Sequence, residues 1–241
     1  MVMKERVLLI LPCYNEEVAL PVLLTELQHT EFPNHYQVDV VVVNDCSKDK
    51  TAQVAKQFKV ALIDLPMNLG IGGAVQTGLQ YAFRNKYDYA IQLDGDGQHP
   101  PHQVATLLAA QQQYKADVVI GSRFVGNGEG FQSSFIRRLG IRYFHWLNRL
   151  FTGNQIFDST SGFRLLNKRA IALAAMHYPD EYPEPESLIL FAKAGYSIVE
   201  VSVQMRQRQG GASSIGSTAS IYYSLKVSLS MFFTFIRQSK Y

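Results

Sequence analysis

The sequence predicts an α/β protein with a doubly wound, mostly parallel sheet, a smaller mixed sheet and a C-terminal amphipathic helix. Short apolar runs alternate with helical stretches through the first half of the chain. The runs are hydrophobic at nearly every position, which is typical of parallel strands covered on both faces. The expected strands are 6–11, 38–43, 60–65, 89–93 and 117–121, and the expected helices between them are 17–28, 72–85 and 101–114.

The second half is less regular and ends in a long helix. We expect strands at 162–167 and 196–203, helices at 137–151 and 186–195, a flexible loop at 126–134 and a rigid acidic loop at 179–186. Residues 217–238 predict a helix with a wide apolar stripe, which would pack on the sheet, lie in a membrane interface or bind a membrane partner. The expected organisation is a domain over 1–216 followed by a membrane- or partner-facing helix over 217–241.

Composition narrows the class of protein. The chain has 241 residues, 47% hydrophobic and 18% charged, which allows one large domain with an ample core. Its two cysteines, Cys13 and Cys46, indicate a reduced, cytoplasmic chain. No signal peptide is evident, and no apolar run reaches the roughly 18 residues of a membrane-spanning helix. The net charge of +3 comes with clusters of basic residues, which suit phosphates or a lipid surface; no nucleic-acid-binding module is recognised.

Polar and glycine-rich segments follow all five expected strands of the first half. They read "PCYNE", "NDCSKD", "PMNLGIGG", "DGDGQH" and "GSRF" in chain order. The carboxyl ends of parallel strands lie along one edge of a sheet, where open α/β sheets bind their ligands. These segments are therefore expected to converge on one site.

The segment "LDGDGQHP" places Asp94 and Asp96 directly after the fourth expected strand. It fails as a helix–loop–helix calcium loop, because the twelfth position is Ala105 rather than a glutamate. A plain turn would explain the glycines but not the strand before them. Asp94, Asp96 and Gln98 offer the hard oxygen ligands of Mg²⁺ or Mn²⁺, which substrate phosphates often complete. We therefore expect a divalent-metal site, with His99 either behind it or purely structural.

Two other strand-end segments allow more than one interpretation. "NLGIGGAVQTG" departs from the dinucleotide-binding fingerprint at Val75, and its glycines are expected to let the helix 72–85 approach the sheet. In "VNDCSKDKT", Asp45 is a candidate acceptor for a base or ribose donor, whereas Ser47 or Asp49 would cap a helix. These two roles can coexist.

Six segments together resemble inverting family 2 glycosyltransferases with the GT-A fold. They are "LPCYNEE", "VVNDCSKDKT", "NLGIGGAVQTG", "LDGDGQHPP", "GSRF" and "DSTSGFRLLNK", in this order. The chain is most similar to the polyprenyl-phosphate glycosyltransferases, the dolichyl-phosphate mannose synthase-like branch, and the resemblance covers essentially its whole length. The two aspartates followed by Gln-His-Pro and the Ser-Gly-Phe-Arg block are its specific parts.

The resemblance implies a role for each matching residue. It implies nucleotide binding by Pro12, Tyr14, Glu16, Asp45, Gly70 and Asp94. It implies metal binding by Asp94, Asp96 and Gln98, and acceptor binding by Arg123, Arg137, Ser161 and Arg164. It implies catalytic roles for Asp96, Asp158 and Arg208, of which Arg208 would reach the diphosphate.

The reaction implied is metal-dependent, inverting transfer of a hexosyl or N-acetylhexosaminyl group from a nucleotide sugar to a polyprenyl phosphate. We expect a UDP-sugar as donor, the cytoplasmic membrane face as location, and cell-surface polysaccharide synthesis as purpose. A small membrane-anchoring protein and a homo-oligomer are conceivable partners. The acceptor phosphate has a second pKa of about 6, so it is largely dianionic near neutral pH and needs no strong base. Asp158 is thus a candidate for orienting substrates or for taking a proton.

Two other functions stay open from the residues. One is transfer to a hydroxyl of a lipid-linked or capsule glycan, which would need a true base near Asp158. The other is a sugar nucleotidyltransferase, which usually has a glycine-rich signature near the first strand, where this chain has "LPCYNEE". The sugar is also open, because Ser214 and "YPEPES" depart from the pattern of the resembling family.

Overall fold

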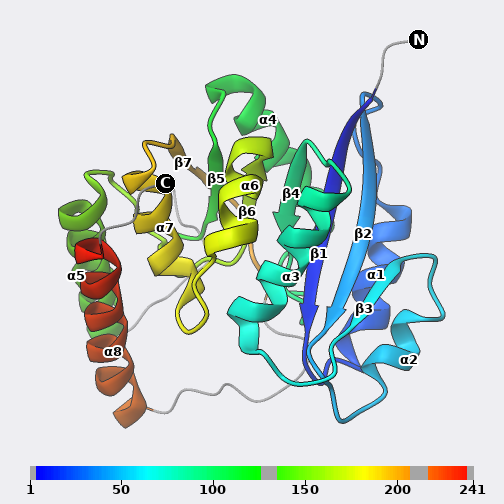
Figure 1. The fold of residues 1–241 in the computed structure, drawn as a ribbon, viewed down its shortest axis with the longest axis horizontal. Coiled ribbons are helices and arrows are strands. Elements are labelled where there is room, and N and C mark those ends of the chain that lie inside the picture. The colour runs from blue at the N-terminus through cyan, green and yellow to red at the C-terminus, as the bar shows by residue number, and fades with distance from the viewer. Residues whose placement is uncertain (1–3, 126–134, 207–216, 238–241) are drawn as a thin grey trace.

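A seven-stranded sheet organises the chain in the computed structural model, which describes residues 4–125, 135–206 and 217–237 (Figure 1). Of residues 135–141 and 217–224 only the backbone is described. The sheet has the order β3-β2-β1-β4-β6-β5-β7. The strands are β1 (Glu5–Cys13), β2 (Tyr36–Asn44), β3 (Ala61–Asp64), β4 (Tyr89–Gln92), β5 (Val118–Ser122), β6 (Arg164–Asn167) and β7 (Ile198–Ser202).

The predicted α/β class is confirmed, and one detail of it is corrected. All strand pairs are parallel except those of β6, which runs antiparallel between β4 and β5. The smaller mixed sheet expected from the sequence is, among the described residues, continuous with the main sheet. The reason is the pairing of Tyr89–Gln92 with Arg164–Asn167, which joins the two halves edge to edge.

Helices cover both faces of the sheet, as the apolar strands require. Strand side chains alternate between faces, so Leu9 packs beneath α1 (Ala19–His29) and α4 (Val104–Tyr114) in one core cluster. Its neighbours Leu8 and Ile10 pack beneath α3 (Gly70–Arg84), α6 (Lys168–His177) and α7 (Pro183–Lys193) in a second cluster. All three strand residues are completely buried.

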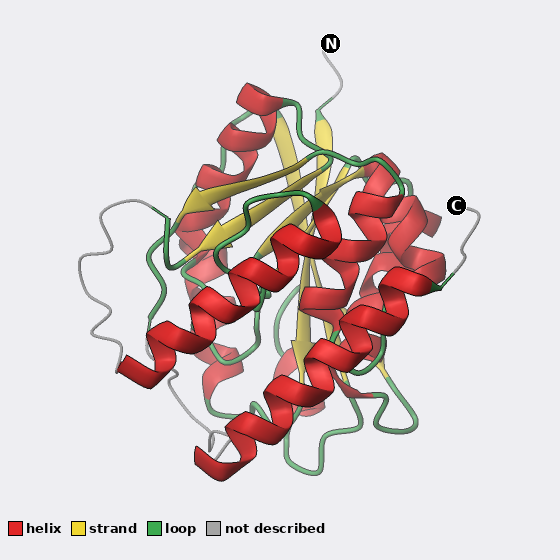
Figure 2. Cartoon of the chain, turned by 90° about the vertical axis from the view of Figure 1, so that its left-hand side faces the viewer, coloured by secondary structure: helices red, strands yellow, loops and turns green. Residues whose placement is uncertain are grey.

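Two long helices lie side by side beyond α7, at the left of Figure 1 and towards the viewer in Figure 2. They are α5 (Phe135–Thr152) and α8 (Ser217–Ile236). Leu147 of α5, Ile189 of α7, and Val227 and Met231 of α8 form a small core of their own. The C-terminal helix therefore packs on helices rather than on the sheet. No helix in the described part of the chain is long and apolar enough to span a membrane.

Several elements differ from the sequence prediction. The short α2 (Thr51–Ala55) and α6 were not expected as helices. The expected acidic loop at 179–186 ends early, because α7 already begins at Pro183, and proline fits the first helical turn. The helix expected from residue 101 begins as a 3₁₀ turn at Pro101–Gln103. The expected loop at 126–134 lies outside the described residues.

Candidate active site

A cavity of about 710 Å³ lies at the carboxyl ends of β1, β2 and β4. The strand order reverses here, since the chain runs outward from β1 to β3 and then places β4 on the other side of β1. Open α/β sheets bind ligands at such a switch point. All six residues predicted to bind nucleotide line this cavity: Pro12, Tyr14, Glu16, Asp45, Gly70 and Asp94.

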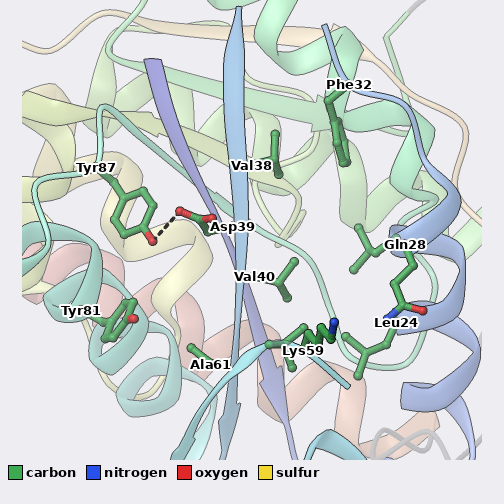
Figure 3. A pocket seen from close by; sticks show the side chains of 12 residues that line it. Leu24, Gln28, Phe32, Val38, Asp39, Val40, Lys59, Ala61, Tyr81 and Tyr87 are labelled. Carbon is green, nitrogen blue, oxygen red and sulfur yellow. Dashed lines mark hydrogen bonds between the residues drawn. The ribbon is translucent and has the colours of Figure 1, made fainter. Parts of the chain in front are cut away.

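A second cavity of about 520 Å³ lies at the opposite end of β2 (Figure 3). Val38 and Val40 face α1, while Asp39 points the other way and accepts a hydrogen bond from the Tyr87 hydroxyl at 2.9 Å. None of the predicted site residues lines it. We therefore place the chemistry at the carboxyl edge of the sheet.

The loops after β1 and β2 are fastened to one another by side chain–backbone hydrogen bonds. The Asn15 N–H donates to Ser47 Oγ at 3.0 Å, and the Lys48 N–H donates to Asn15 Oδ1 at 2.8 Å. One turn further on, the Glu16 N–H donates to Thr51 Oγ1 at 2.8 Å. Asn15 itself has a positive φ of 57°, a conformation that asparagine tolerates better than most residues. These bonds give one wall of the cavity a fixed backbone.

Asp49 and Asp45 each hold the start of a helix. Asp49 Oδ1 accepts from the Thr51 N–H at 2.9 Å at the beginning of α2. The N-cap residue of α2 is Lys50, so Asp49 supports the helix start from one position before the predicted cap. Asp45 is buried, and its Oδ1 accepts from the Leu69 N–H at 2.6 Å, just before α3. A carboxylate at the first turn of α3 is favourable, because the helix dipole is positive there.

The glycines of α3 have different structural roles. Gly70 has a positive φ of 74°, which glycine adopts without strain, and it opens the helix at the cavity. A Cβ on Gly78 would lie 2.3 Å from Ile10 of β1, so this glycine lets the helix approach the sheet, as predicted. A Cβ on Gly72 would lie 2.3 Å from the Asp180 carbonyl oxygen, so Gly72 instead admits the backbone that precedes α7.

Asp94 is oriented by a buried histidine. The Asp94 N–H donates to His99 Nδ1 at 3.0 Å, which leaves the imidazole proton on Nε2. His99 Nε2 lies 3.7 Å from Asp94 Oδ2, and the ring stacks on Phe163 with centroids 4.9 Å apart. His99 is almost completely buried, whereas the Asp94 side chain is 34% exposed to the cavity. Of the two roles considered for His99, the geometry supports the one behind the metal site.

Asp96 completes a pair of carboxylates that suits a divalent cation. Its Oδ1 accepts from the Gln98 N–H at 3.0 Å, which fixes the tight loop. No group of three or more acidic, histidine or cysteine side chains suited to a metal occurs in the described part of the chain. Two carboxylates still fit Mg²⁺ or Mn²⁺, which keep several positions for water and substrate phosphate. Gln98 does not line the cavity, so its predicted role as a ligand stays a prediction.

Arg123 and Asp158 form a two-point ion pair beside the cavity. The guanidinium donates from Nε to Asp158 Oδ2 at 2.8 Å and from Nη2 to Oδ1 at 2.7 Å. Burial alone would lower the pKa of Arg123, but the hydrogen bonds and charge of Asp158 raise it above its ordinary value. Nη2 also donates to Thr160 Oγ1, which belongs to a residue lining the cavity. The Asp158 side chain is completely buried, which favours an orienting role over proton transfer.

Glu200 supports this pair from β7. Its carboxylate accepts from the backbone N–H groups of Phe157 at 2.8 Å and Asp158 at 2.6 Å. Burial raises the pKa of Glu200 above its ordinary value, although these hydrogen bonds oppose the shift. Glu200 is not among the residues predicted from the sequence; the available signal was one acidic residue in the apolar strand "YSIVEVSV".

Ser161 and Arg164, predicted as acceptor contacts, are placed inside the protein instead. Ser161 is buried and its hydroxyl donates to the Gly121 carbonyl at 2.6 Å. Arg164 is 1% exposed, and its guanidinium donates to the carbonyls of Ser159, Ser161 and Glu184 at 2.7 Å each. The specific Ser-Gly-Phe-Arg block therefore holds the neighbouring backbone in place.

The remaining predicted residues are not placed. Arg208 lies outside the described residues, and Arg137 lies in α5 where only the backbone is described. Among the residues that line the cavity, the sequence analysis missed Thr160 and Glu184. Glu184 fell in a segment expected to be a loop, whereas the structure places it in the first turn of α7.

The fold and this site define a GT-A-like α/β enzyme of the glycosyltransferase class. Glucosyl-3-phosphoglycerate synthase from Mycobacterium tuberculosis, in complex with Mn²⁺, UDP-glucose and phosphoglyceric acid, has the same fold with a TM-score of 0.71. The two sequences are 14% identical, and the match covers 98% of this chain and 81% of that one.

The chain belongs to glycosyl transferase family 2, whose profile matches residues 8–173. It is 32% identical over 216 residues to an undecaprenyl-phosphate mannosyltransferase from Micrococcus luteus, covering 86% of each chain. It is 29% identical over 215 residues to a UDP-N-acetylglucosamine–dolichyl-phosphate N-acetylglucosaminyltransferase from Methanococcus voltae, covering 81% of this chain and 84% of the relative. These relatives agree with the resemblance to the polyprenyl-phosphate branch.

Proposed function

We propose that this glycosyltransferase moves a sugar from a nucleotide sugar to a polyprenyl phosphate, with inversion, at the cytoplasmic face of the membrane. The observation that carries the proposal is the pair Asp94 and Asp96, which lines the cavity at the switch point of the sheet. The names of its family 2 relatives support the polyprenyl phosphate acceptor. Cell-surface glycan synthesis is the process that such a product would serve.

The donor half of the site suits a nucleoside diphosphate. Tyr14 and Asp45 stand on the side of the cavity formed by β1 and β2, where the nucleoside would lie. The first turn of α3, with Gly70, supplies backbone N–H groups and a positive dipole for phosphate oxygens. A bound Mg²⁺ or Mn²⁺ would neutralise charge on the leaving diphosphate. Arg208 would add to this neutralisation. Its position at the diphosphate is a prediction from the resemblance alone.

The acceptor half of the proposed site depends on Arg123, whose direction is fixed by Asp158. Arg123 keeps 22% of its side chain exposed although two of its nitrogens bind Asp158. We propose that it holds the acceptor phosphate, aided by Arg137, and that Asp158 fixes its direction. Placing two anionic substrates close together is the main task of this half, since the phosphate dianion needs no added base.

An enzyme that uses a lipid acceptor has to contact the membrane that holds it. The surface of α5 and α8 is apolar and suits such a contact. Trp146 and Leu150 of α5 and Phe232 and Phe233 of α8 are between 45% and 60% exposed. Neither helix contains an aspartate or glutamate, whereas Arg142, Arg149 and Lys226 are exposed on them. Apolar side chains flanked by basic residues suit the interface of an anionic bilayer. We propose that this surface rests on the membrane as a peripheral attachment.

The alternative acceptor, a hydroxyl of a lipid-linked glycan, fits the site less well. A hydroxyl must lose its proton, so it needs a carboxylate or imidazole that can accept one. Asp158 is buried and engaged with Arg123, and Glu200 behind it faces backbone N–H groups.

Incubation with labelled nucleotide sugars and Mn²⁺, with either undecaprenyl phosphate or a lipid-linked glycan as acceptor, followed by organic extraction, tests the proposal. We expect label from one of UDP-glucose, UDP-N-acetylglucosamine and GDP-mannose in the lipid fraction. Label that appears only on a lipid-linked glycan with a free hydroxyl would favour the alternative. Label in no lipid with any of these donors would contradict the proposal.

A further inference from the structure

We infer that Glu184 binds hydroxyl groups of the donor sugar and selects uncharged hexoses; this inference rests on the proposed function. Glu184 lines the cavity together with Thr160 and Gly162, on the β6 side of Asp94. The residues proposed for the nucleoside lie on the β1 and β2 side. Because β4 stands between β1 and β6 in the sheet, Asp94 separates the two groups. The sugar follows the diphosphate in the donor, so it would lie past the metal carboxylates, against Glu184.

The backbone of Glu184 is held rigidly. Its carbonyl oxygen accepts from Arg164 Nη1 at 2.7 Å and from Ser187 Oγ at 3.1 Å. Pro183 and Pro185 flank it in the first turn of α7 and restrict the backbone further. The buried Arg164 thereby joins β6 to α7 at this residue. These contacts fix the backbone position from which the Glu184 side chain extends, as a residue that determines specificity requires.

The wall beside Glu184 is shaped to leave room near Asp94. A Cβ on Gly162 would lie 2.7 Å from Gln92 Nε2 and 3.1 Å from Asp94 Oδ1. Gly162 therefore lets the β6 side of the cavity approach Asp94 without a side chain in between. The charge of Asp94 contributes to the raised pKa of Glu184, which agrees with their closeness.

The Glu184 carboxylate has unused capacity to accept hydrogen bonds. The carboxylate accepts a hydrogen bond from the backbone N–H of Glu184 itself, whereas the bonds from Arg164 and Ser187 end on the carbonyl oxygen, so further acceptor positions of the carboxylate are open to a ligand. Burial raises the pKa of this carboxyl, while the charge of Arg164 opposes the shift. The Glu184 side chain is half-buried, and a carboxylate that is partly removed from water is stabilised when donors reach it. Sugar hydroxyls are such donors, and each would form a charge-assisted bond.

The same carboxylate would reject acidic sugars. A uronic acid would bring a third carboxylate next to Glu184 and Asp94, and like charges at short range are unfavourable. The chemical class expected is therefore a nucleotide-linked neutral hexose, with or without an acetamido group, whose free hydroxyls face α7.

Calorimetry on the full chain with Mn²⁺ tests this inference with Glu184→Gln. The probe is whichever of UDP-glucose, UDP-N-acetylglucosamine and GDP-mannose the wild type transfers, compared with its sugar-free nucleoside diphosphate. We expect the Kd of the sugar nucleotide to rise about tenfold while that of the nucleoside diphosphate stays within about twofold. UDP-glucuronate should bind the variant more tightly than the wild type. Glu181→Gln, the same change at an exposed position three residues earlier, should leave every Kd unchanged.

Failure of the role of Glu184 and failure of the proposed function give different results. Equal Kd values for wild type and Glu184→Gln, or an equal loss for the sugar nucleotide and the nucleoside diphosphate, would overturn the role of Glu184 alone. Absence of transfer from all three donors by the wild type would overturn the proposed function, and the inference with it. Equal thermal unfolding of wild type and Glu184→Gln would exclude misfolding as the cause of a loss, and Glu184→Asp is a second variant if the first unfolds.

Discussion

Arg123 donates two hydrogen bonds, of 2.8 and 2.7 Å, to a completely buried Asp158. This pairing changes the role expected of both residues. Asp158 accepts from the Arg123 backbone N–H as well, at 3.0 Å, and from the Thr160 hydroxyl at 3.4 Å, so both of its oxygens are engaged. The carboxylate that is a candidate base instead supports Arg123, the arginine that we propose to bind the acceptor phosphate.

Asp158→Asn should weaken acceptor use without changing the shape of the pH–rate profile. An asparagine keeps the size of the side chain but loses the charge that orients Arg123, so kcat/KM for polyprenyl phosphate should fall about tenfold to a hundredfold. Loss of the acidic limb of that profile, or of nearly all turnover at saturating acceptor, would instead identify Asp158 as a base. Initial rates at several pH values separate these outcomes.

Arg123→Ala should raise the KM for the acceptor far more than the KM for the donor. The reason is that the guanidinium binds Asp158 and Thr160 at the side of the cavity, whereas the residues proposed for the nucleoside follow β1 and β2. Arg84→Ala, a change at an exposed position in the last turn of α3, is the matched control. If both Michaelis constants rise equally in Arg123→Ala, the acceptor role is wrong.

The double variant Trp146→Ser, Phe233→Ser should bind vesicles less tightly while folding normally. Both side chains are more than half exposed, so the folded protein loses little packing. Burying each aromatic side chain in a bilayer interface contributes about 1.5–3 kcal/mol, so partitioning onto phosphatidylglycerol vesicles should drop at least about tenfold. Tyr114→Ser on α4 removes an equally exposed aromatic residue from another surface. Equal losses in the two proteins would count against the α5 and α8 surface.

Glu200 should make the protein less stable as pH rises. Its pKa is raised in the folded state, so between the ordinary glutamate pKa of 4.5 and the folded value the folded state binds more protons than the unfolded state. The contribution of Glu200 to stability is therefore complete below pH 4.5 and is lost as pH rises through the folded pKa. Denaturant unfolding of wild type and Glu200→Gln at several pH values isolates this contribution. A difference in unfolding free energy that does not vary with pH would contradict it.

The sequence predicted the residues that line the cavity at the ends of β1, β2 and β4 better than the placement of Ser161 and Arg164, for physical reasons. Tyr14, Asp45 and Asp94 follow strands directly, and strand direction alone brings them to one edge. Arg164 is the first residue of β6, but its buried guanidinium depends on the carbonyls of Ser159 in the preceding loop and of Glu184 in α7. An arginine is normally expected at the surface, so no local pattern could reveal this.

The same difference between local and long-range features separates the parts of the fold that were predicted from those that were not. The apolar runs predicted β1 to β5, because uninterrupted hydrophobicity requires cover on both faces. The antiparallel insertion of β6 was not predictable, since it depends on its long-range pairing with β4. Helix α2 has five residues, too few for a helical period to stand out, and α6 begins directly at the end of β6.

Mass spectrometry of the lipid product and the released nucleotide tests the central claim most directly, with wild type and Asp96→Ala side by side. The account predicts a polyprenyl monophosphate carrying one sugar together with a nucleoside diphosphate. It also predicts a loss of at least about a hundredfold in Asp96→Ala, because a cation held by Asp94 and Asp96 would stabilise the departing diphosphate by several kcal/mol. A polyprenyl diphosphate sugar with release of a nucleoside monophosphate, or full activity in Asp96→Ala with an unchanged fold, would contradict it.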